Sequence, residues 1–195
     1  MKIRQPYEEK SNRGKYLVGV LALFIISIMV FSVLSLNSED KEEKITYKDQ
    51  LFVKTNQGWQ TYINNQQYFF SYNPLELENI TLPANFNVNK LNSAQKIYLS
   101  LNPEEDIYLA MQEFYKLLKP LITQKMQESC FIDVERCAAL PLKTCDSATP
   151  DVKVILIKQD NLSKIDYQYN CLTIQGDPEN LIKNIDKISL NFLGL

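Results

Sequence analysis

The chain has 195 residues, enough for one ordinary domain with short additions, and carries 21 basic and 23 acidic side chains. It contains no histidine, which excludes Ser-His-Asp catalysis, Cys-His catalysis and imidazole metal ligands. No pair of glycines has the spacing of a phosphate-binding loop; the glycines are Gly14, Gly19, Gly58, Gly176 and Gly194. We therefore expect no cofactor and no metal site.

The N-terminal 36 residues predict a basic tail followed by a membrane-spanning helix. Residues 1–15 have a net charge of +3, and residues 16–36 contain no charged side chain. Those 21 residues would form a helix about 31 Å long, which matches the hydrocarbon core of a bilayer. Since basic residues stay on the cytoplasmic side, we expect a single-pass protein of the cell membrane with a cytoplasmic N-terminus.

Two alternatives for this apolar segment stay open. The first is a cleaved signal peptide, since Val33-Leu34-Ser35 loosely matches a cleavage site. The second is a pilin-like subunit whose mature chain begins at Lys15, although no glutamate lies early in the apolar run. The run exceeds the usual length of a signal peptide, about 7–15 apolar residues, which favours an uncleaved anchor in the lipid bilayer over residues 16–36.

Residues 37–44 predict a charged linker, and residues 45–195 an extracytoplasmic domain. The charge beyond residue 36 sums to −5, so nucleic acid is not an expected partner. The start of the domain predicts a three-stranded antiparallel meander over residues 49–55, 59–63 and 67–72, because β-branched and aromatic residues alternate with Asn- and Gly-containing turns.

Five aromatic residues of the meander are a candidate binding face. Exposed aromatic rings can stack on sugars or on a protein partner. The alternative, which the usual burial of large rings favours, is that they pack in the core. The five residues are Trp59, Tyr62, Tyr68, Phe70 and Tyr72.

Two similar βα units are predicted after a loop over residues 73–93, which has a helical turn near residues 75–79. Strand-like runs at 96–101 and 171–176 each lead into Asn-Pro or Asp-Pro, which is typical of a helix start. Apolar residues then recur at three- and four-residue spacing, as in a helix that covers a sheet.

The expected N-caps of these helices are Asn102 and Asp177, and Pro120 should bend or end the first helix. Another strand is predicted at 152–158. The fold class is therefore α+β: a three-stranded antiparallel meander, then βα, a cysteine-containing loop, ββ and α.

The four cysteines predict two disulfide bonds. Their spacing, C-x6-C-x7-C-x25-C, lacks the C-x-x-C of zinc ribbons and thioredoxin-like redox sites. All four follow the apolar segment and would lie in an oxidising compartment. Of the three pairings we prefer Cys130–Cys137, which closes a local loop, and Cys145–Cys171, which ties that loop to the penultimate strand. An all-thiolate metal site and free thiols are the alternatives.

Other motifs carry weaker signals. Ser93-Ala94-Gln95-Lys96 matches the S-x-x-K of penicillin-interacting serine enzymes, but the partner motifs S-D-N and K-T-G are missing. Paired acids of the kind that glycosidases use occur at Glu76 and Glu78 and at Glu104, Glu105 and Asp106, but a solvated polar loop and a helix start explain them better. Acceptor sequences for N-glycosylation begin at Asn79 and Asn161.

Three segments, FVKTNQGWQT, LPLKTC and NCLTIQGDPENLIKNIDKI followed by LGL, carry a resemblance to a known group. They resemble uncharacterised small single-pass membrane proteins of tiny-genome archaea, from about residue 47 to the C-terminus. The resemblance implies an anchored extracytoplasmic domain with paired cysteines, and it transfers no catalytic or binding residue.

These observations favour a non-catalytic binding or structural module of the cell envelope, with an envelope or surface protein as its unidentified partner. An extracytoplasmic histidine-free hydrolase, which would use a Ser/Lys pair or paired carboxylates, is the alternative. A pilin-like subunit is the third hypothesis.

Overall fold

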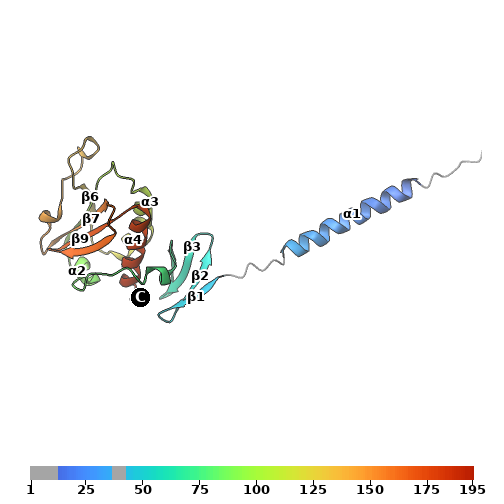
Figure 1. Ribbon diagram of the computed structural model, residues 1–195, viewed down its shortest axis with the longest axis horizontal. Helices are drawn as coiled ribbons and strands as arrows, with labels where there is room; N and C mark the ends of the chain where they lie inside the picture. The colour runs from blue at the N-terminus through green and yellow to red at the C-terminus, as the bar shows by residue number, and fades with distance from the viewer. Residues whose placement is uncertain (1–12, 37–42) are drawn as a thin grey trace, which may run out of the picture. The chain divides into compact units, whose positions relative to one another are not determined.

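The computed structural model describes residues 13–36 and 43–195, so most of the predicted basic tail and of the charged linker lies outside the described residues. The chain divides into an N-terminal unit that ends at Glu42 and a domain from Glu43 to Leu195. Helix α1 spans Arg13–Leu36 (Figure 1). Among the described side chains, which in α1 are those of residues 16–32, no helix is long and apolar enough to cross a membrane. The span expected over residues 16–36 is not confirmed and stays a prediction.

The meander has four antiparallel strands instead of the three predicted. They follow chain order in the sheet: β1 (Lys44–Tyr47), β2 (Gln50–Thr55), β3 (Gly58–Ile63) and β4 (Gln66–Phe70). Both residues of the turns Lys48-Asp49 and Asn64-Asn65 have positive φ, as tight two-residue hairpins require. The prediction missed β1 because this short strand follows directly on the charged linker.

A five-stranded mixed sheet forms the rest of the domain. Its strands are β5 (Lys96–Leu101), β6 (Met126–Cys130), β7 (Val152–Gln159), β8 (Lys164–Gln168) and β9 (Cys171–Gly176). The order is β6-β5-β7-β9-β8, and only β8 runs antiparallel to its neighbour. The three predicted strands are β5, β7 and β9. The two that were missed, β6 and β8, lie at the edges and are rich in polar residues.

The helical segments match the prediction only in part. They are η1 (Pro74–Leu77), α2 (Val88–Asn92), α3 (Tyr108–Glu113), the π-helical turn η2 (Phe114–Leu118), η3 (Lys119–Leu121), η4 (Glu135–Cys137), η5 (Cys145–Ser147) and α4 (Pro178–Phe192). Of these, α2, η4 and η5 were not predicted. The turn near residue 75 is confirmed as η1. Asp177 caps α4 as expected, because its carboxylate accepts a hydrogen bond from the Asn180 N–H at 2.8 Å.

The helix start predicted at Asn102 and Pro103 is wrong. The Asn102 side chain instead accepts a hydrogen bond from the Glu104 N–H at 3.0 Å, which forms a local turn, and α3 begins only at Tyr108. Pro120 lies in η3, which closes this helical segment as predicted.

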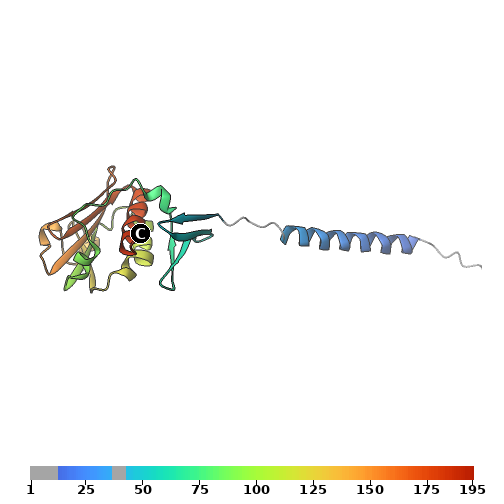
Figure 2. The same cartoon turned by 90° about the horizontal axis from the view of Figure 1, so that it is seen from below.

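A helical layer lies between the two sheets, as both views show (Figures 1 and 2). One side of the layer packs on the mixed sheet, with Ile155, Leu172 and Ile185 among its fully buried contacts. The other side packs on the meander, where Phe52 and Phe70 form a second cluster with residues from α4 and η2. The domain is thus an α+β fold with its helices shared by both sheets.

Candidate functional site

Both predicted disulfide bonds are present. Cys130 and Cys137 are bonded with their Cα atoms 6.1 Å apart, and Cys145 and Cys171 with theirs 5.2 Å apart. The side chains of Cys130, Cys137 and Cys171 are buried. The four cysteines therefore have a structural role in this fold, as two disulfide bonds.

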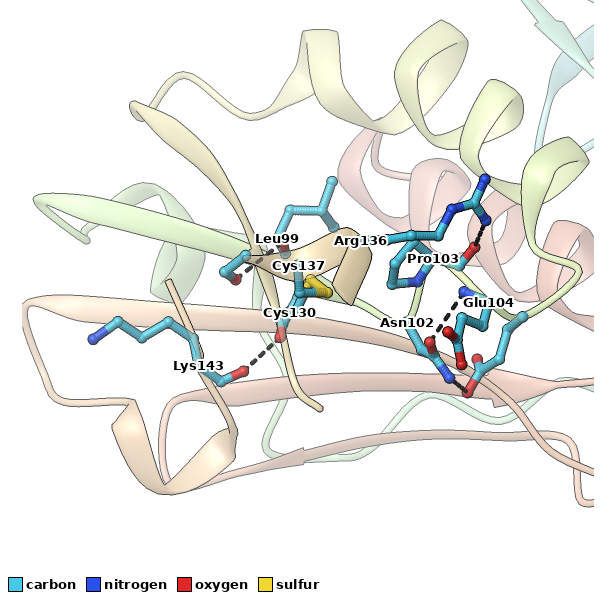
Figure 3. The surroundings of a disulfide bond; sticks show 11 residues. Leu99, Asn102, Pro103, Glu104, Cys130, Arg136, Cys137 and Lys143 are labelled. Carbon is cyan, nitrogen blue, oxygen red and sulfur yellow. Dashed lines mark hydrogen bonds between the residues drawn. A yellow bond between two sulfur atoms is a disulfide. The ribbon is translucent and has the colours of Figure 1, made fainter. Parts of the chain in front are cut away.

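The first disulfide lies among hydrogen bonds that involve both backbone and side-chain groups (Figure 3). The Lys143 N–H donates to the Cys130 carbonyl oxygen at 2.7 Å, and the Arg136 guanidinium donates to the Pro103 carbonyl oxygen at 2.8 Å. The second disulfide brings Cys145 onto the face of the mixed sheet that the helices leave open, beside Val154 and Leu156. The cysteine loop is thus the cover of that second face.

The predicted Ser/Lys pair does not form. The Ser93 hydroxyl donates to the carbonyl oxygen of Lys90 at 3.0 Å, and the Lys96 ammonium lies 4.4 Å from the centre of the Tyr98 ring. This contact lowers the pKa of Tyr98, because the Lys96 ammonium favours the phenolate.

The predicted acidic pairs are surface or loop features. Glu76, Glu78 and Glu104 are exposed. Glu105 accepts a hydrogen bond from the Gln159 N–H at 2.6 Å, and the Asp106 N–H donates to the Gln159 side chain at 3.2 Å. These acids fix the end of β7 and do not face each other across a cavity.

The five meander aromatics do not share one exposed face. Trp59 and Phe70 are buried in the cluster between the meander and the helices, with Tyr68 and Tyr72 half-buried against it. Tyr62 is exposed, because strand alternation points it away from that core. The core interpretation is therefore correct for Trp59 and Phe70.

The two N-glycosylation acceptors, Asn79 and Asn161, are both exposed. Their side chains are sterically available to a glycosylating enzyme. Modification at these sites stays a prediction.

Sequence reasoning missed the site that the structure points to. An open cavity of about 880 Å³, called the α3 cavity below, lies along α3 and η2 and is completed by residues that follow β4 and lie on α4. Most of its lining is apolar. The lining residues are Ser71, Tyr108, Leu109, Met111, Gln112, Glu113, Tyr115, Lys116 and Ile182.

A polar cluster borders the α3 cavity. The Ser71 hydroxyl donates to Glu113 Oε2 at 2.7 Å, and the Lys116 ammonium lies 2.6 Å from the same oxygen and 3.5 Å from Ser71 Oγ. The backbone N–H of Tyr72 donates to Asp186 Oδ2 at 2.9 Å. Residues that directly follow β4, residues of the α3–η2 segment and a residue of α4 therefore meet at one point.

Glu113 and Asp186 form a buried carboxyl pair. Asp186 has no exposed surface, Glu113 is 5% exposed, and their side chains are hydrogen-bonded to each other. Burial, and then the negative charge of Glu113, raise the pKa of Asp186 well above its ordinary value. Two buried oxygens, Glu113 Oε1 and Asp186 Oδ1, have no N–H or O–H donor in the described part of the chain. A carboxyl proton on Asp186 would supply such a donor, in agreement with the raised pKa of this group.

No sequence motif identified this cluster. Ser71 precedes Glu113 by 42 residues, and the Tyr72 N–H precedes Asp186 by 114. The one local signal is the spacing of Glu113 and Lys116, an acid–base pair at i, i+3 that is common on helix surfaces.

The fold and the site define an α+β domain with two disulfides, in which two sheets share one helical layer that carries an apolar cavity with a polar border. No known protein family, curated protein or solved structure matches the chain. The functional argument therefore rests on the geometry of the α3 cavity.

Proposed function

We propose that the chain is a single-pass membrane protein whose outer domain, residues 45–195, binds an envelope amphiphile with its apolar acyl chain in the α3 cavity. The observation that carries this proposal is the gathering of exposed apolar side chains around a hollow. Tyr108 is 68% exposed and Leu109 is 57% exposed, and both line the cavity.

Apolar surface left in water is unfavourable by about 25 cal/mol per Å², and single exposed apolar residues need no explanation. A group of them around a concave surface marks a binding site. The volume of about 880 Å³ also lies within the range of ligand pockets, roughly 300–1,000 Å³.

The polar border supports an amphiphile over a purely apolar ligand. Ser71, Glu113 and Lys116 offer hydrogen bonds and charge at one side of the cavity, while Leu109, Met111 and Ile182 are apolar. A ligand with a polar head and an acyl chain would contact both parts. Two disulfides and the uncharged run over residues 16–36 support an anchored position outside the cytoplasm.

Photolabelling of the full chain in lipid nanodiscs tests the proposal. A fatty acid that carries a diazirine should label peptides within residues 108–116 saturably, and unlabelled fatty acid should compete. Leu109→Arg and Tyr108→Ser should reduce that labelling at least tenfold. Tyr62→Ser is the matched control, because Tyr62 is also exposed (56%) but lies outside the cavity.

Labelling of α1 by bilayer lipid provides an internal standard in the same sample. The binding proposal fails if residues 108–116 are not labelled above that standard. It also fails if Leu109→Arg and Tyr62→Ser reduce the labelling equally.

A further inference from the structure

We propose that Ser71 is a nucleophile and Glu113 its general base, so that the domain hydrolyses esters of apolar acyl chains bound in the α3 cavity. The inference rests on the proposed function, because the same cavity must first hold the acyl chain. It adds a reaction to that binding site.

Ser71 has the position and the contact that a serine nucleophile needs. It directly follows β4, is exposed and lines the cavity. A serine hydroxyl is a weak nucleophile until an adjacent base accepts its proton. Without histidine, a carboxylate within hydrogen-bond distance can fill this role, and Glu113 Oε2 is 2.7 Å from Ser71 Oγ.

Asp186 is the positioning residue of this arrangement. It is fully buried and hydrogen-bonded to Glu113, so it orients the base without reaching the cavity. Its other contact is with the N–H of Tyr72, the residue next to Ser71. One side chain therefore fixes both the base and the backbone that carries the nucleophile, which is the role of the third member of a catalytic triad.

Lys116 supplies positive charge where negative charge would develop. Its ammonium lies 3.5 Å from Ser71 Oγ and 2.6 Å from Glu113 Oε2. When Ser71 attacks a carbonyl carbon, the carbonyl oxygen becomes an oxyanion close to Oγ, and a cation beside it lowers the energy of that state. The same ammonium forms an ion pair with the carboxylate that acts as the base.

The reaction balances without a metal ion, an oxidant or a reductant. Ser71 Oγ bonds to the carbonyl carbon while its proton passes to Glu113, and the bond to the leaving alcohol breaks as Glu113 gives that proton to the alcohol oxygen. Water then attacks the acyl-Ser71 ester and transfers one proton to Glu113. The carboxylic acid leaves, and Ser71 Oγ regains the proton from Glu113.

The experiment uses the full chain in nanodiscs, with p-nitrophenyl octanoate and p-nitrophenyl acetate as substrates and a fluorophosphonate as an active-site label. We expect label on Ser71, mapped by peptide mass spectrometry, and a higher kcat/KM for octanoate than for acetate. Ser71→Ala should reduce hydrolysis to the background rate, and Glu113→Gln should lower kcat/KM by about 10²–10⁴-fold. Ser93→Ala is the matched control, since Ser93 is outside the cavity, and should leave the rate unchanged.

Asp186→Asn separates a positioning role from a merely structural one through the pH profile. Glu113, Lys116 and the N–H of Tyr72 are the groups that act on Asp186. The wild-type profile of kcat/KM should contain an inflection where Asp186 loses its proton, and the variant should lack that inflection. An unchanged profile contradicts the assigned role of Asp186.

The hydrolysis proposal is overturned if the folded wild type releases no p-nitrophenol above background, if the label lies elsewhere than Ser71, or if Ser71→Ala keeps the activity. Intact disulfides, measured by mass under non-reducing conditions, establish that each sample is folded. Photolabelling by the fatty acid should persist in Ser71→Ala. A wild type that is photolabelled but shows no hydrolysis therefore overturns the proposed reaction alone and leaves the binding proposal intact.

Discussion

The carboxyl pair of Glu113 and Asp186 shows how one buried group can hold several elements together. Asp186 on α4 contacts Glu113 on α3 and the backbone that follows β4. A buried ionised carboxylate is strongly unfavourable, and the raised pKa of Asp186 means that it stays neutral instead. The pair therefore links the meander to the helical layer while Asp186 stays in its neutral, protonated form.

Asp186→Asn should stabilise the domain at neutral pH. The folded pKa of Asp186 lies above the unfolded one, so its contribution is fully present below the unfolded pKa and is lost as the pH rises toward the folded value. Each unit of that pKa difference is equivalent to about 1.4 kcal/mol. The amide is neutral at every pH and its oxygen still accepts from Tyr72.

Thermal unfolding from pH 4 to pH 8 checks this prediction, with a Tm difference between variant and wild type that grows as the pH rises. Asp166→Asn is the control, because Asp166 forms a partly exposed ion pair with Lys164 at 3.1 Å. Its substitution should change the free energy of unfolding by less than about 1 kcal/mol. A lower Tm for Asp186→Asn at pH 8 would contradict the neutral state of Asp186.

At the scale of elements, the hairpin between β2 and β3 sets the backbone beside Ser71. Gly58 has φ +113°, and a Cβ there would clash with the carbonyl oxygen of Phe70 and approach the Cα of Ser71. Glycine is the residue that permits both the positive φ and the close approach.

Gly58→Ala should therefore destabilise the domain by roughly 1–3 kcal/mol and weaken photolabelling of the α3 cavity, because the end of β4 must move. Gly194→Ala is the control for the steric clash, since Gly194 also has a positive φ (+82°) but open space around the added Cβ. Chemical unfolding and photolabelling of both variants provide the comparison. Equal loss of labelling in the two variants would disprove the link between the hairpin and the cavity.

The two disulfides should contribute unequally to stability. The bonded cysteines are separated by 7 residues in the first and by 26 in the second. Chain-entropy estimates are about 2.4 kcal/mol for the shorter loop and about 3.5 kcal/mol for the longer one. We expect the double variant Cys145→Ala/Cys171→Ala to lose about 1 kcal/mol more than Cys130→Ala/Cys137→Ala in urea unfolding, and the opposite order would contradict this account.

The predicted elements were correct where local physics decides. The apolar, β-branched runs of β5, β7 and β9 and the cap at Asp177 depend on neighbours in sequence. The helix start predicted at Asn102 was wrong because Asn-Pro followed by acids suits a turn equally well. The turn is held by the hydrogen bond from the Gln159 N–H to Glu105, which lies 54 residues away. Strand order and the Ser71–Glu113 contact are likewise long-range, so no local pattern contains them.

At the scale of the whole molecule, the membrane anchor is the prediction with the most direct test. A charged residue at the centre of a spanning helix opposes insertion by about 2.5–3.5 kcal/mol. Ile26→Lys should therefore move protein from the carbonate-resistant membrane pellet to the supernatant, whereas Ile26→Leu should not.

The cysteines report the compartment in the same experiment. A domain that reaches an oxidising compartment forms both disulfides, whereas a domain retained in the cytoplasm keeps four free thiols. Wild-type protein found in the carbonate supernatant would refute the anchor.

The two disulfides also differ in what their formation requires of the folding chain. The ring from Cys130 to Cys137 is local and can close at any stage, but Cys171 lies on β9, opposite Val154 of β7. We expect Cys145 to reach Cys171 only after these two parallel strands have paired and the cysteine loop lies on the sheet, as both do in the folded domain. Closure of the second bond would thus indicate that the domain has folded. An incompletely folded chain would keep the thiols of Cys145 and Cys171 available for thiol–disulfide exchange.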